Sequence, residues 1–474
     1  MNIIHISAEC YPAAKVGGLA DVVGALPKYQ NITGNNAMVI MPHYYSKFRT
    51  ENQYKKVYSS SAKMNHHNYP FDIFKLLNKN LGFDIYSIDI PGLFDRENIY
   101  SYNDDTERFI TFQISALNWI NSWKKLPDII HCHDQHTGFI PFMIANVGQY
   151  EKLKNIPTVF TIHNGQYQGQ FGFNKLDCLP PFHSFFNGKI DWDGDINPLA
   201  SAIKCAWRLT TVSPNYMNEI SNSMMGLEKL LKMEQPKSVG ILNGIDTDVW
   251  NPSTDNMLKR KYSLKSAGAG KSANKKWLCN QYNLDASKPL FVFIGRLVGE
   301  KGADVLPEAI YNTLKQYPNE QNVLVLGSGE PYIEQALSDL EQHFKGNYCS
   351  YIGYNEQLSH IIYAGADFLL MPSRVEPCGL NQLYALRYGT IPIVRRTGGL
   401  YDTVVDIGDG GFGFCHNETN AWDIKHSIER AKHLYKNKKQ FNKIRQQIMQ
   451  IDHSWNKASS EYIELYKSLK HTNE

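Results

Sequence analysis

The fold is decided by the stretch NIIHISAECYPAAKVGGLADVVGALPK at residues 2–28. Its first apolar run, NIIHIS (2–7), predicts a buried β-strand. A loop that contains Lys15, Gly17 and Gly18 follows. Apolar residues then recur at the spacing of one buried helix face: Leu19, Val22, Val23 and Leu26. The stretch therefore predicts a strand, a loop and a helix in succession, the unit from which parallel α/β sheets are built.

The loop between this strand and helix has two interpretations. Glycine allows close approach of the backbone to a ligand, and amides at a helix N-terminus favour an anion. Alternatively, the turn needs glycine only for tight packing. A second copy favours the ligand, because RTGGLYDTV (396–404) repeats the order cation, Gly-Gly, Leu, Asp of KVGGLADVV (15–23). Neither copy is G-x-G-x-x-G, so a dinucleotide fingerprint is absent.

Near-continuous apolar runs in both halves of the chain predict strands that are buried on both faces. They lie at 2–7, 37–42, 128–134, 158–164 and 208–213, and again at 289–297, 322–329, 366–373 and 390–396. Helical patterns separate them, which makes βαβ units. Residues 71–90 are an exception and predict an antiparallel hairpin around Asn80-Leu81-Gly82. The sequence therefore predicts two doubly wound α/β domains, with a boundary between 240 and 290.

Composition excludes several classes of protein. The 474 residues include 49 basic and 46 acidic side chains, and a net charge of +3 argues against a generic nucleic-acid binder. The N-terminus lacks a basic leader, and no apolar run reaches membrane-spanning length. Eight scattered cysteines without a CxxC pair favour reduced thiols over a disulfide framework or a zinc site. We expect a soluble cytoplasmic protein with no membrane partner.

Residues 256–284 carry seven Lys or Arg and no acidic residue. One interpretation is a solvated connector and helix face, and the other is positive charge beside a cleft that receives an anion. SAGAGKSANK (266–275) resembles a phosphate-binding P-loop, but that motif needs glycine at position 265, where the chain has Lys265. No strand precedes it either, so the P-loop is rejected.

HCHDQH (131–136) nearly matches the ligand run of binuclear metallohydrolases, but Asp134 comes one position early. In a strand, His131 and His133 share a face while Asp134 points away, which is the wrong geometry for a metal. Hydrogen-bonding side chains at the carboxyl end of a strand are the favoured interpretation, because open α/β sheets bind ligands there. His163 and Asn164 end the next predicted strand in the same way and suit the hydroxyls of a sugar.

The second half of the chain offers the same pattern with more charge. Arg296 and Lys301 flank a strand-to-helix turn, where two cations can clamp a diphosphate. Glu376 follows a buried strand and can accept hydrogen bonds from a sugar, while the amides of 379–381 meet phosphate. Exposed cations and a helix-capping carboxylate are the alternatives. Two more predicted strands end on the same side, at 327–331 and 352–354.

With these residues described, the chain resembles the bacterial glycogen synthases and the plant starch synthases of the same family. A linked set of motifs carries the resemblance over nearly the whole chain: KVGGLADVVGALP, HCHD, HNGQYQG, NGID, GRLVGEKG, SRVEPCGLNQLY, RRTGGLYDTV and HSWNKASSEYIELY. The set is highly specific, although no single member is. The chain departs from the family pattern at Gln135, where tryptophan is usual.

The resemblance implies a GT-B fold, in which two Rossmann-like domains face each other across a deep cleft. It implies an N-terminal domain of residues 1–242, a nucleotide-sugar domain of residues 243–455, and a last helix at 456–474 that packs back on the first domain. The implied reaction is a retaining transfer of glucose from ADP-glucose to the non-reducing end of an α-1,4-glucan such as glycogen. No metal or other cofactor is implied.

The resemblance also implies roles for single residues. The implied catalytic residues are Lys15, Asp134, His163, Arg296, Lys301 and Glu376. The implied substrate-binding residues are Gly17, Gly18, Asp21, Asn164, Asn243, Gly327, Tyr354, Cys378, Gly379, Leu380, Asn381 and Thr397. Of these, Arg296 and Lys301 would neutralise the leaving diphosphate, and Tyr354 is a candidate for stacking on adenine.

Retention at the anomeric carbon could proceed through a carboxylate nucleophile, as in retaining glycosidases. No carboxylate here is an obvious candidate, so front-face attack guided by the leaving phosphate is the preferred hypothesis. A trapped glucosyl adduct on Glu376 or Asp134 would overturn it.

Three alternatives stay open. UDP-glucose could replace ADP-glucose, because phosphate and glucose contacts do not distinguish the bases. A metal-dependent hydrolase could be built on the histidines of 131–136 and would lose activity with a chelator. A two-domain sugar-binding protein without catalysis has no need for Arg296 and Lys301 together.

Overall fold

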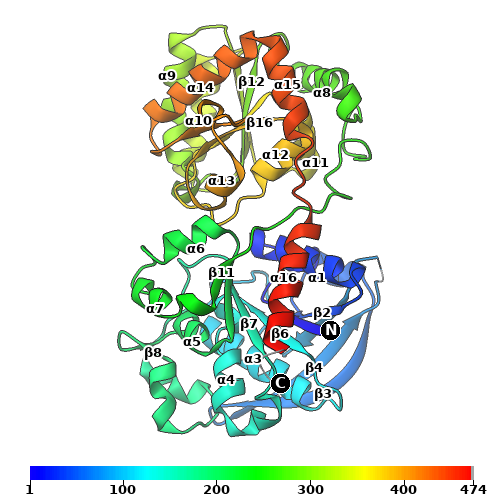
Figure 1. The fold of residues 1–474 in the computed structure, drawn as a ribbon, viewed down its shortest axis with the longest axis vertical. Coiled ribbons are helices and arrows are strands. Elements are labelled where there is room, and N and C mark those ends of the chain that lie inside the picture. The colour runs from blue at the N-terminus through cyan, green and yellow to red at the C-terminus, as the bar shows by residue number, and fades with distance from the viewer. Residues whose placement is uncertain (79, 471–474) are drawn as a thin grey trace. The chain divides into compact units, whose positions relative to one another are not determined.

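The computed structural model describes residues 1–78 and 80–470, which form two compact units (Figure 1). Unit 1 comprises Met1–Leu242 and the C-terminal helix from Trp455, and unit 2 comprises Asn243–Ser454. Each unit is built on one large β-sheet with helices packed against it.

The sheet of unit 1 has nine strands in the order β11-β10-β7-β6-β1-β2-β5-β4-β3. Their bounds are β1 (Asn2–Ile6), β2 (Asn36–Pro42), β3 (Tyr54–Met64), β4 (His67–Leu76), β5 (Asp84–Asp89), β6 (Ile129–His133), β7 (Thr158–Ile162), β10 (Arg208–Thr211) and β11 (Ser238–Gly240). Every neighbouring pair is parallel from β11, at one edge of the sheet, as far as β5. The remaining strand pairs are antiparallel, because β4 pairs antiparallel with both β5 and β3. The short hairpin of β8 (Asp191–Trp192) and β9 (Asp195–Ile196) lies outside the sheet.

The helices of unit 1 follow the strands as crossover connections and surface elements. They are α1 (Gly18–Ile32), α2 (Lys47–Glu51), α3 (Asp105–Asn121), α4 (Ile140–Asn146), α5 (Pro198–Cys205), α6 (Pro214–Ile220), α7 (Glu228–Met233) and α16 (Trp455–Lys470). In α1 the predicted apolar face is buried, with Leu19, Val22, Val23 and Leu26 all less than 9% exposed. The strand, loop and helix expected from the opening stretch are therefore confirmed.

The predicted hairpin is confirmed as the β4–β5 pair, although Lys79 in its turn lies outside the described residues. The edge strand β3 was not predicted from the sequence, because its outward side chains are polar and mostly exposed. Polar side chains on an edge strand protect a sheet from pairing with other chains, and they also remove the hydrophobic alternation that reveals a strand.

The last helix, α16, belongs to the core of unit 1. Its Trp455, Tyr462 and Tyr466 are at most 2% exposed and pack in one cluster with Ile3 of β1 and Leu26 of α1. The chain therefore returns, after all of unit 2, to complete the hydrophobic core of its first unit.

The sheet of unit 2 has six parallel strands in the order β14-β13-β12-β15-β16-β17. The strands are β12 (Leu290–Ile294), β13 (Asn322–Gly327), β14 (Tyr348–Ile352), β15 (Phe368–Met371), β16 (Ile391–Arg395) and β17 (Phe414–His416). The helices are α8 (Ala267–Gln281), α9 (Leu306–Gln316), α10 (Pro331–His343), α11 (Glu356–Gly365), α12 (Asn381–Tyr388), α13 (Gly398–Thr403), α14 (Ala421–Lys436) and α15 (Lys438–Ile448). Parallel α/β architecture is thus confirmed in both units.

The parallel strands of each unit share one topology. Numbered by occurrence, those of unit 2 lie in the order 3-2-1-4-5-6, and those of unit 1 follow the same order with a seventh strand added. In such sheets the strand order reverses at a switch point, and ligands bind in the crevice outside the carboxyl ends of the strands there. The switch points lie between β1 and β6 in unit 1 and between β12 and β15 in unit 2.

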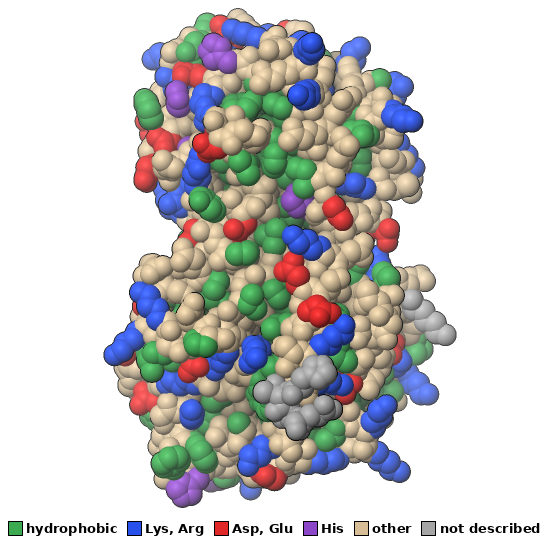
Figure 2. All heavy atoms as spheres, in the orientation of Figure 1, with side chains coloured by type: hydrophobic (Ala, Val, Ile, Leu, Met, Phe, Trp, Pro, Cys, Tyr) green, Lys and Arg blue, Asp and Glu red, His purple; other side chains and the backbone are tan. Residues whose placement is uncertain are grey.

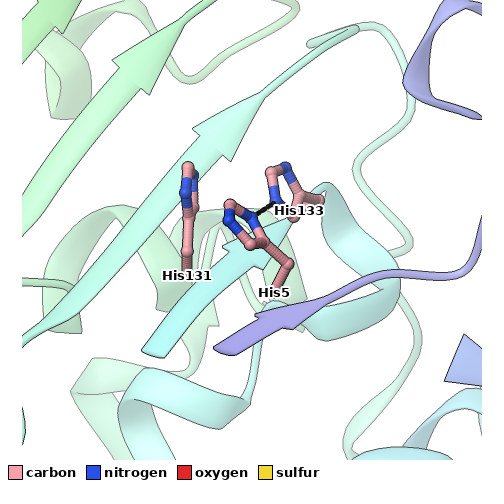
Figure 3. Close-up of side chains that lie close together, drawn as sticks. All are labelled: His5, His131 and His133. Carbon is pink, nitrogen blue, oxygen red and sulfur yellow. Dashed lines mark hydrogen bonds between the residues drawn. The ribbon is translucent and has the colours of Figure 1, made fainter. Parts of the chain in front are cut away.

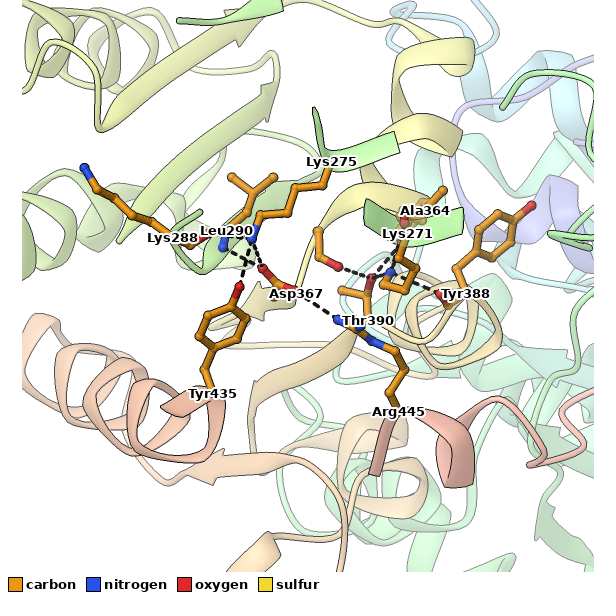
Figure 4. A network of polar contacts seen from close by, with 12 residues as sticks. Lys271, Lys275, Lys288, Leu290, Ala364, Asp367, Tyr388, Thr390, Tyr435 and Arg445 are labelled. Atoms are coloured by element: carbon orange, nitrogen blue, oxygen red, sulfur yellow. Dashed lines mark hydrogen bonds and ion pairs between the residues drawn. The ribbon is translucent and has the colours of Figure 1, made fainter. Parts of the chain in front are cut away.

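Most of the basic stretch at 256–284 fits the solvated connector, because five of its seven basic side chains are exposed, namely Lys259, Arg260, Lys261, Lys265 and Lys276. Its other two lysines differ from both interpretations given above. Lys271 and Lys275 of α8 are only 2% and 6% exposed, so they belong neither to a solvated face nor to an open anion cleft. Lys271 donates to three backbone carbonyls and to Thr390 Oγ1, while Lys275 pairs with Asp367 at 2.6 Å (Figure 4). Asp367 also pairs with Arg445 at 3.0 Å. These lysines join α8 to the strands and helices beneath it.

The surface agrees with the nearly balanced composition. On the face drawn in Figure 2, basic and acidic side chains are interspersed over both units. Among the described residues, no helix combines the length and hydropathy that crossing a membrane requires.

Candidate functional site

Three predicted residues of unit 1 lie together at the carboxyl ends of β6 and β7. Asp134 directly follows β6, and its Oδ1 accepts hydrogen bonds from the backbone amides of His163 at 2.7 Å and Asn164 at 3.4 Å. His163 and Asn164 follow β7. The prediction that these polar residues meet at one edge of the sheet is therefore confirmed in its geometry, and that edge includes the switch point.

Asp134 has two unusual properties. Burial raises the pKa of its carboxyl group to about 7, against the amide hydrogen bonds that lower it. Its backbone lies at φ +56° and ψ 174°, a region that costs a residue with a side chain about 1–3 kcal/mol. Perturbed pKa values and backbone strain both concentrate at functional sites. Asp134 can therefore change its protonation near neutral pH.

The loop after β1 brings Lys15 to the other side of the same switch point. Lys15 Nζ pairs with Asp21 Oδ1 at 2.7 Å, and about 43% of the Lys15 side chain is exposed. The Gly17 amide donates to Glu9 Oε2 at 3.1 Å, and the Val16 amide donates to the same oxygen at 2.6 Å. A carboxylate from the protein therefore takes the Gly17 amide that the sequence suggested for a phosphate.

Glu9 is a site residue that the sequence analysis missed. Its second oxygen accepts a hydrogen bond from Tyr100 at 2.7 Å, and burial raises the pKa of the Glu9 carboxyl group. The available signal was weak, because Glu9 is a single acid three positions beyond the end of β1. Glu9 fixes the conformation of the Lys15 loop.

The two Gly-Gly loops, similar in sequence, differ in what surrounds them. A Cβ added at Gly17 or Gly18 would meet no protein atom within 4 Å. A Cβ at Gly398 would collide with the Glu376 carbonyl, and one at Gly399 with the Cys378 carbonyl. Gly398 also has φ +44°, which favours glycine. Packing accounts for the second pair, whereas the protein gives no steric reason for the first.

This difference predicts opposite effects of alanine. Gly17→Ala should leave the melting temperature nearly unchanged but lower enzymatic activity by about tenfold or more if a ligand occupies the open space. Gly399→Ala should lower stability by about 2 kcal/mol or more, because backbone must move to admit the methyl group. Thermal unfolding and initial rates on the two variants check both. A Gly17→Ala enzyme that is stable and fully active would contradict a ligand at this loop.

The histidines of β6 form a buried cluster with His5 of β1 (Figure 3). His5, His131 and His133 could geometrically surround a metal ion, since their ligand nitrogens lie within 4.8 Å of one another. All six ring nitrogens already contact protein partners, including Thr161 for His131. A metal would have to displace these hydrogen bonds, so the residues fit a hydrogen-bonded core better than a metal centre.

Gln135, where the chain departs from the family pattern, is accommodated locally. Its Nε2 lies 2.9 Å from His136 Nε2, and its Oε1 lies against Gly169, where a Cβ would collide with it. The side chain therefore fills space beside the glycine-rich segment that follows His163.

In unit 2 the charged residues gather at the carboxyl edge of the sheet. Lys301 Nζ lies 3.0 Å from Glu376 Oε1 and 3.3 Å from Glu300 Oε1. Although burial disfavours its charged form, attraction to Glu376 and Glu300 holds the pKa of Lys301 above its usual value. Arg296 Nη2 contacts Glu300 at 3.3 Å, and 53% of its side chain is exposed. Glu300, which lies between the two cations in sequence, was also missed.

Hydrogen bonds connect the other predicted loops of unit 2 to this cluster. Asn381 Nδ2 donates to the carbonyl of Ile294 at the end of β12, at 2.7 Å. The Gly399 amide donates to the Glu376 carbonyl at 3.1 Å, and Ser373 Oγ donates to Glu376 Oε2 at 2.8 Å. The loops after β12, β15 and β16 thus meet around Glu376, beside the switch point of this sheet.

A hydrogen bond also connects two other predicted residues of unit 2, Asn243 and Cys378. The Asn243 backbone amide hydrogen-bonds to the Cys378 thiol, whose pKa burial raises to about 12. Asn243 is 5% exposed, and its Oδ1 has no hydrogen-bond partner among the described residues. A buried amide oxygen without a partner is costly in a protein alone and is relieved when a ligand donates to it.

The remaining predicted residues of unit 2 lie at the same edge. Gly327 ends β13, and Tyr354 follows β14 with 80% of its surface exposed. Gly379 has φ +72°, Leu380 caps α12, and Thr397 caps α13. In chemical terms, unit 2 offers cations and helix amides for an anion next to a carboxylate for hydroxyls, and unit 1 offers a carboxylate and an imidazole.

Comparison with known proteins agrees with this geometry. The model of the starch synthase catalytic domain matches residues 2–233, and that of the glycosyl transferases group 1 matches residues 275–447. A glycogen synthase of Flavobacterium johnsoniae is 54% identical over 99% of both chains. The chain belongs to the glycogen and starch synthase family. It is a glycosyltransferase.

More distant members of the family match over the same length. A glycogen synthase of Anoxybacillus flavithermus is 36% identical over 99% of this chain and 98% of its own. The structure of the catalytic domain of starch synthase IV from Arabidopsis thaliana, bound to ADP and acarbose, is 34% identical with a TM-score of 0.90 over 99% of both chains. The predicted GT-B fold class and the predicted family are thus confirmed.

Proposed function

We propose that this enzyme transfers glucose from ADP-glucose to the non-reducing end of an α-1,4-glucan, with retention and without a metal ion. One observation carries the proposal: in both units the predicted residues meet beside a topological switch point, where α/β sheets bind ligands. The starch synthase IV structure was solved with ADP bound, which supports ADP-glucose over UDP-glucose as the donor.

The proposed roles in unit 2 follow from charge. When the bond between the anomeric carbon of glucose and the diphosphate breaks, negative charge develops on the departing diphosphate. Arg296, Lys301 and the amides at the start of α12 supply positive charge and donors for it. Glu376, held by Lys301 and Ser373, accepts hydrogen bonds from glucose hydroxyls. Because these groups belong to the protein, the stabilisation requires no metal.

The other proposed contacts in unit 2 follow from exposure and unsatisfied polarity. We assign to Tyr354, which is 80% exposed beyond β14, the role of stacking on adenine, and to the unpartnered Asn243 Oδ1 a hydrogen bond accepted from the bound donor. Cys378, Gly327 and Thr397 are assigned further contacts with the donor, as the family resemblance implies.

The proposed roles in unit 1 concern the sugar. Asp134, His163 and Asn164 hold glucose hydroxyls at the ends of β6 and β7. Lys15 meets the donor or the reacting glucose by exchanging Asp21 for the ligand, while Gly17 and Gly18 leave room for it. No carboxylate is assigned as a nucleophile, and attack occurs on the face that the diphosphate leaves. We further propose a cytoplasmic location, which suits the eight free cysteines.

The test is an assay of nucleotide release. The enzyme is incubated with glycogen and either ADP-glucose or UDP-glucose, with and without EDTA. We expect ADP release and elongated glucan chains, unaffected by EDTA. Preference for UDP-glucose would correct the donor, loss of activity with EDTA would refute metal independence, and no release from either donor would refute the function.

A further inference from the structure

A chain of hydrogen-bonded side chains runs through the core of unit 1 from α16 to the candidate site. Gln30 Nε2 donates to the Tyr466 hydroxyl at 3.3 Å, and Gln30 Oε1 lies 2.8 Å from His5 Nε2. His5 Nδ1 lies 3.0 Å from His133 Nε2, the contact drawn in Figure 3. His133 Nδ1 lies 3.0 Å from His163 Nε2. All five side chains are buried, none more than 7% exposed.

The three histidines of this hydrogen-bonded series, His5, His133 and His163, are neutral near pH 7. Burial lowers the pKa of His5 to about 4 and that of His163 to about 3. Burial, together with the neighbouring histidines, lowers the pKa of His133 well below its usual value. Each ring therefore carries one proton, which lies on either Nδ1 or Nε2.

The contacts between the rings couple these choices. Each nitrogen–nitrogen contact needs one N–H donor and one bare acceptor. With one proton per ring, only two arrangements satisfy both contacts: all three rings protonated at Nε2, or all three protonated at Nδ1. The partner of His5 Nε2 decides between them. Because Gln30 presents its carbonyl oxygen there, His5 must donate from Nε2, and His133 and His163 must follow.

The contacts made by α16 agree with this orientation of the Gln30 amide. The Tyr466 oxygen accepts from Gln30 Nε2, so its own hydrogen is free to point to His131 Nδ1, 2.7 Å away. His131 then carries its proton at Nε2 and donates to Thr161 Oγ1 at 2.6 Å. Turning the Gln30 amide over would require every proton in this second branch to move as well.

We infer that Gln30, held by Tyr466, is a positioning residue that fixes the proton of His163 on Nε2 and leaves its Nδ1 as a hydrogen-bond acceptor for the substrate. The inference rests on the proposed function for the identity of the substrate, a glucosyl donor. His163 Nδ1 has no hydrogen-bond partner among the described residues. It is not fully shielded from solvent, so a ligand can reach it. This nitrogen is the last member of the hydrogen-bonded series, at the edge of the sheet where Asp134 lies.

The chemical consequence is a defined direction of one hydrogen bond. An acceptor nitrogen receives a hydrogen bond from a sugar hydroxyl, so the hydroxyl oxygen keeps its lone pairs for donors such as the Asn164 amide group. If the histidine protons were reversed, the same hydroxyl would have to accept from His163 and rotate away from that arrangement. The position of one proton on His163 thus depends on a tyrosine from the far end of the chain.

The direct test is ¹⁵N NMR of the full-length enzyme with labelled histidine, without substrate, at neutral pH. Imidazole ¹⁵N shifts distinguish a protonated nitrogen from a bare one. The signals of His5, His133 and His163 among the 16 histidines are assigned by single substitutions. We expect all three to carry the proton on Nε2. A proton on Nδ1 of His163 would overturn the inference without any further variant.

Two variants test whether Gln30 and Tyr466 are responsible. Gln30→Met removes the acceptor with little change of volume, and Tyr466→Phe removes the hydroxyl that orients the Gln30 amide. Each should produce a mixed proton position on His163 and lower kcat/KM for ADP-glucose by roughly threefold to tenfold, the effect of one misdirected hydrogen bond. Unchanged ¹⁵N shifts of His163 in a folded Gln30→Met enzyme would also overturn the inference.

Tyr462→Phe is the matched control. Tyr462 lies one turn before Tyr466 on α16, and its ring packs 5.4 Å from that of His131, but the chain does not run through its hydroxyl. Its removal should leave the His163 shifts unchanged, and a shift as large as that of Tyr466→Phe would contradict the assigned path. Since the NMR measurement needs no turnover, failure of the proposed function and failure of this inference give different results.

Discussion

Lys301→Met is expected to lower kcat for glucosyl transfer by about a hundredfold to a thousandfold, the range found when one preorganised donor to developing charge is removed. Lys301 is the cation held closest to Glu376, with its Nζ 3.0 Å from the carboxylate, and only 18% of its side chain is exposed. It therefore supplies charge where water contributes little. Initial rates at saturating ADP-glucose and glycogen measure the effect.

The same substitution should also destabilise the fold, which must be separated from catalysis. Glu376 is 9% exposed and would lose its charged partner, at a cost of about 2 kcal/mol. The double variant Lys301→Met/Glu376→Gln removes the unpaired charge, so its melting temperature should return towards that of the wild type while activity stays low. If activity returned together with stability, both Lys301 and Glu376 would have only structural roles.

Asp134→Asn is expected to abolish most activity, by about a thousandfold, and to stabilise the protein. The pKa of Asp134, about 7, lies above the value near 4 of an unfolded chain. Between these values the native state keeps a proton that the unfolded state has lost, so this group makes stability fall as pH rises from about 4 to 7. Asparagine keeps an oxygen for the His163 amide and lacks that penalty.

The expected gain in unfolding free energy is therefore close to zero at pH 4 and roughly 2 to 4 kcal/mol at pH 8. Urea unfolding of wild type and variant at several pH values measures it. Asp128 is the matched control: although burial opposes this, its contacts with Lys470 and the Asn2 amide lower its pKa, so Asp128→Asn should destabilise above pH 4. A gain for Asp134→Asn that does not depend on pH would contradict the raised pKa.

Local pattern was sufficient to predict most of the fold. Strands such as β12 and β15 are apolar throughout because both faces are covered, and this signal survives in a single sequence. The short strands β11 and β17 and the polar edge strand β3 were missed because they lack that signal. Lys271 and Lys275 look like surface residues in sequence, and only the carbonyls and carboxylate that surround them show otherwise.

The candidate site was predicted where strands end and missed where side chains meet across the fold. Asp134, His163 and Glu376 directly follow strands or lie a few residues beyond them, so topology alone brings them to the ligand edge. Glu9, Gln30 and Tyr466 act through contacts between distant segments, and Gln30 and Tyr466 are 436 positions apart. No local pattern encodes such a pair. The Gly-Gly repeat was only half informative, because packing explains the second copy.

The return of α16 to unit 1 has a consequence for synthesis of the chain. Trp455, Tyr462 and Tyr466 complete the core of unit 1, yet they leave the ribosome after the 212 residues of Asn243–Ser454. At typical elongation rates, this delay is roughly 10 to 45 s. During that time the surfaces of β1 and α1 that α16 will cover stay open to water and to chaperones. Unit 1 is therefore the first part of the enzyme to be made and the last to be finished.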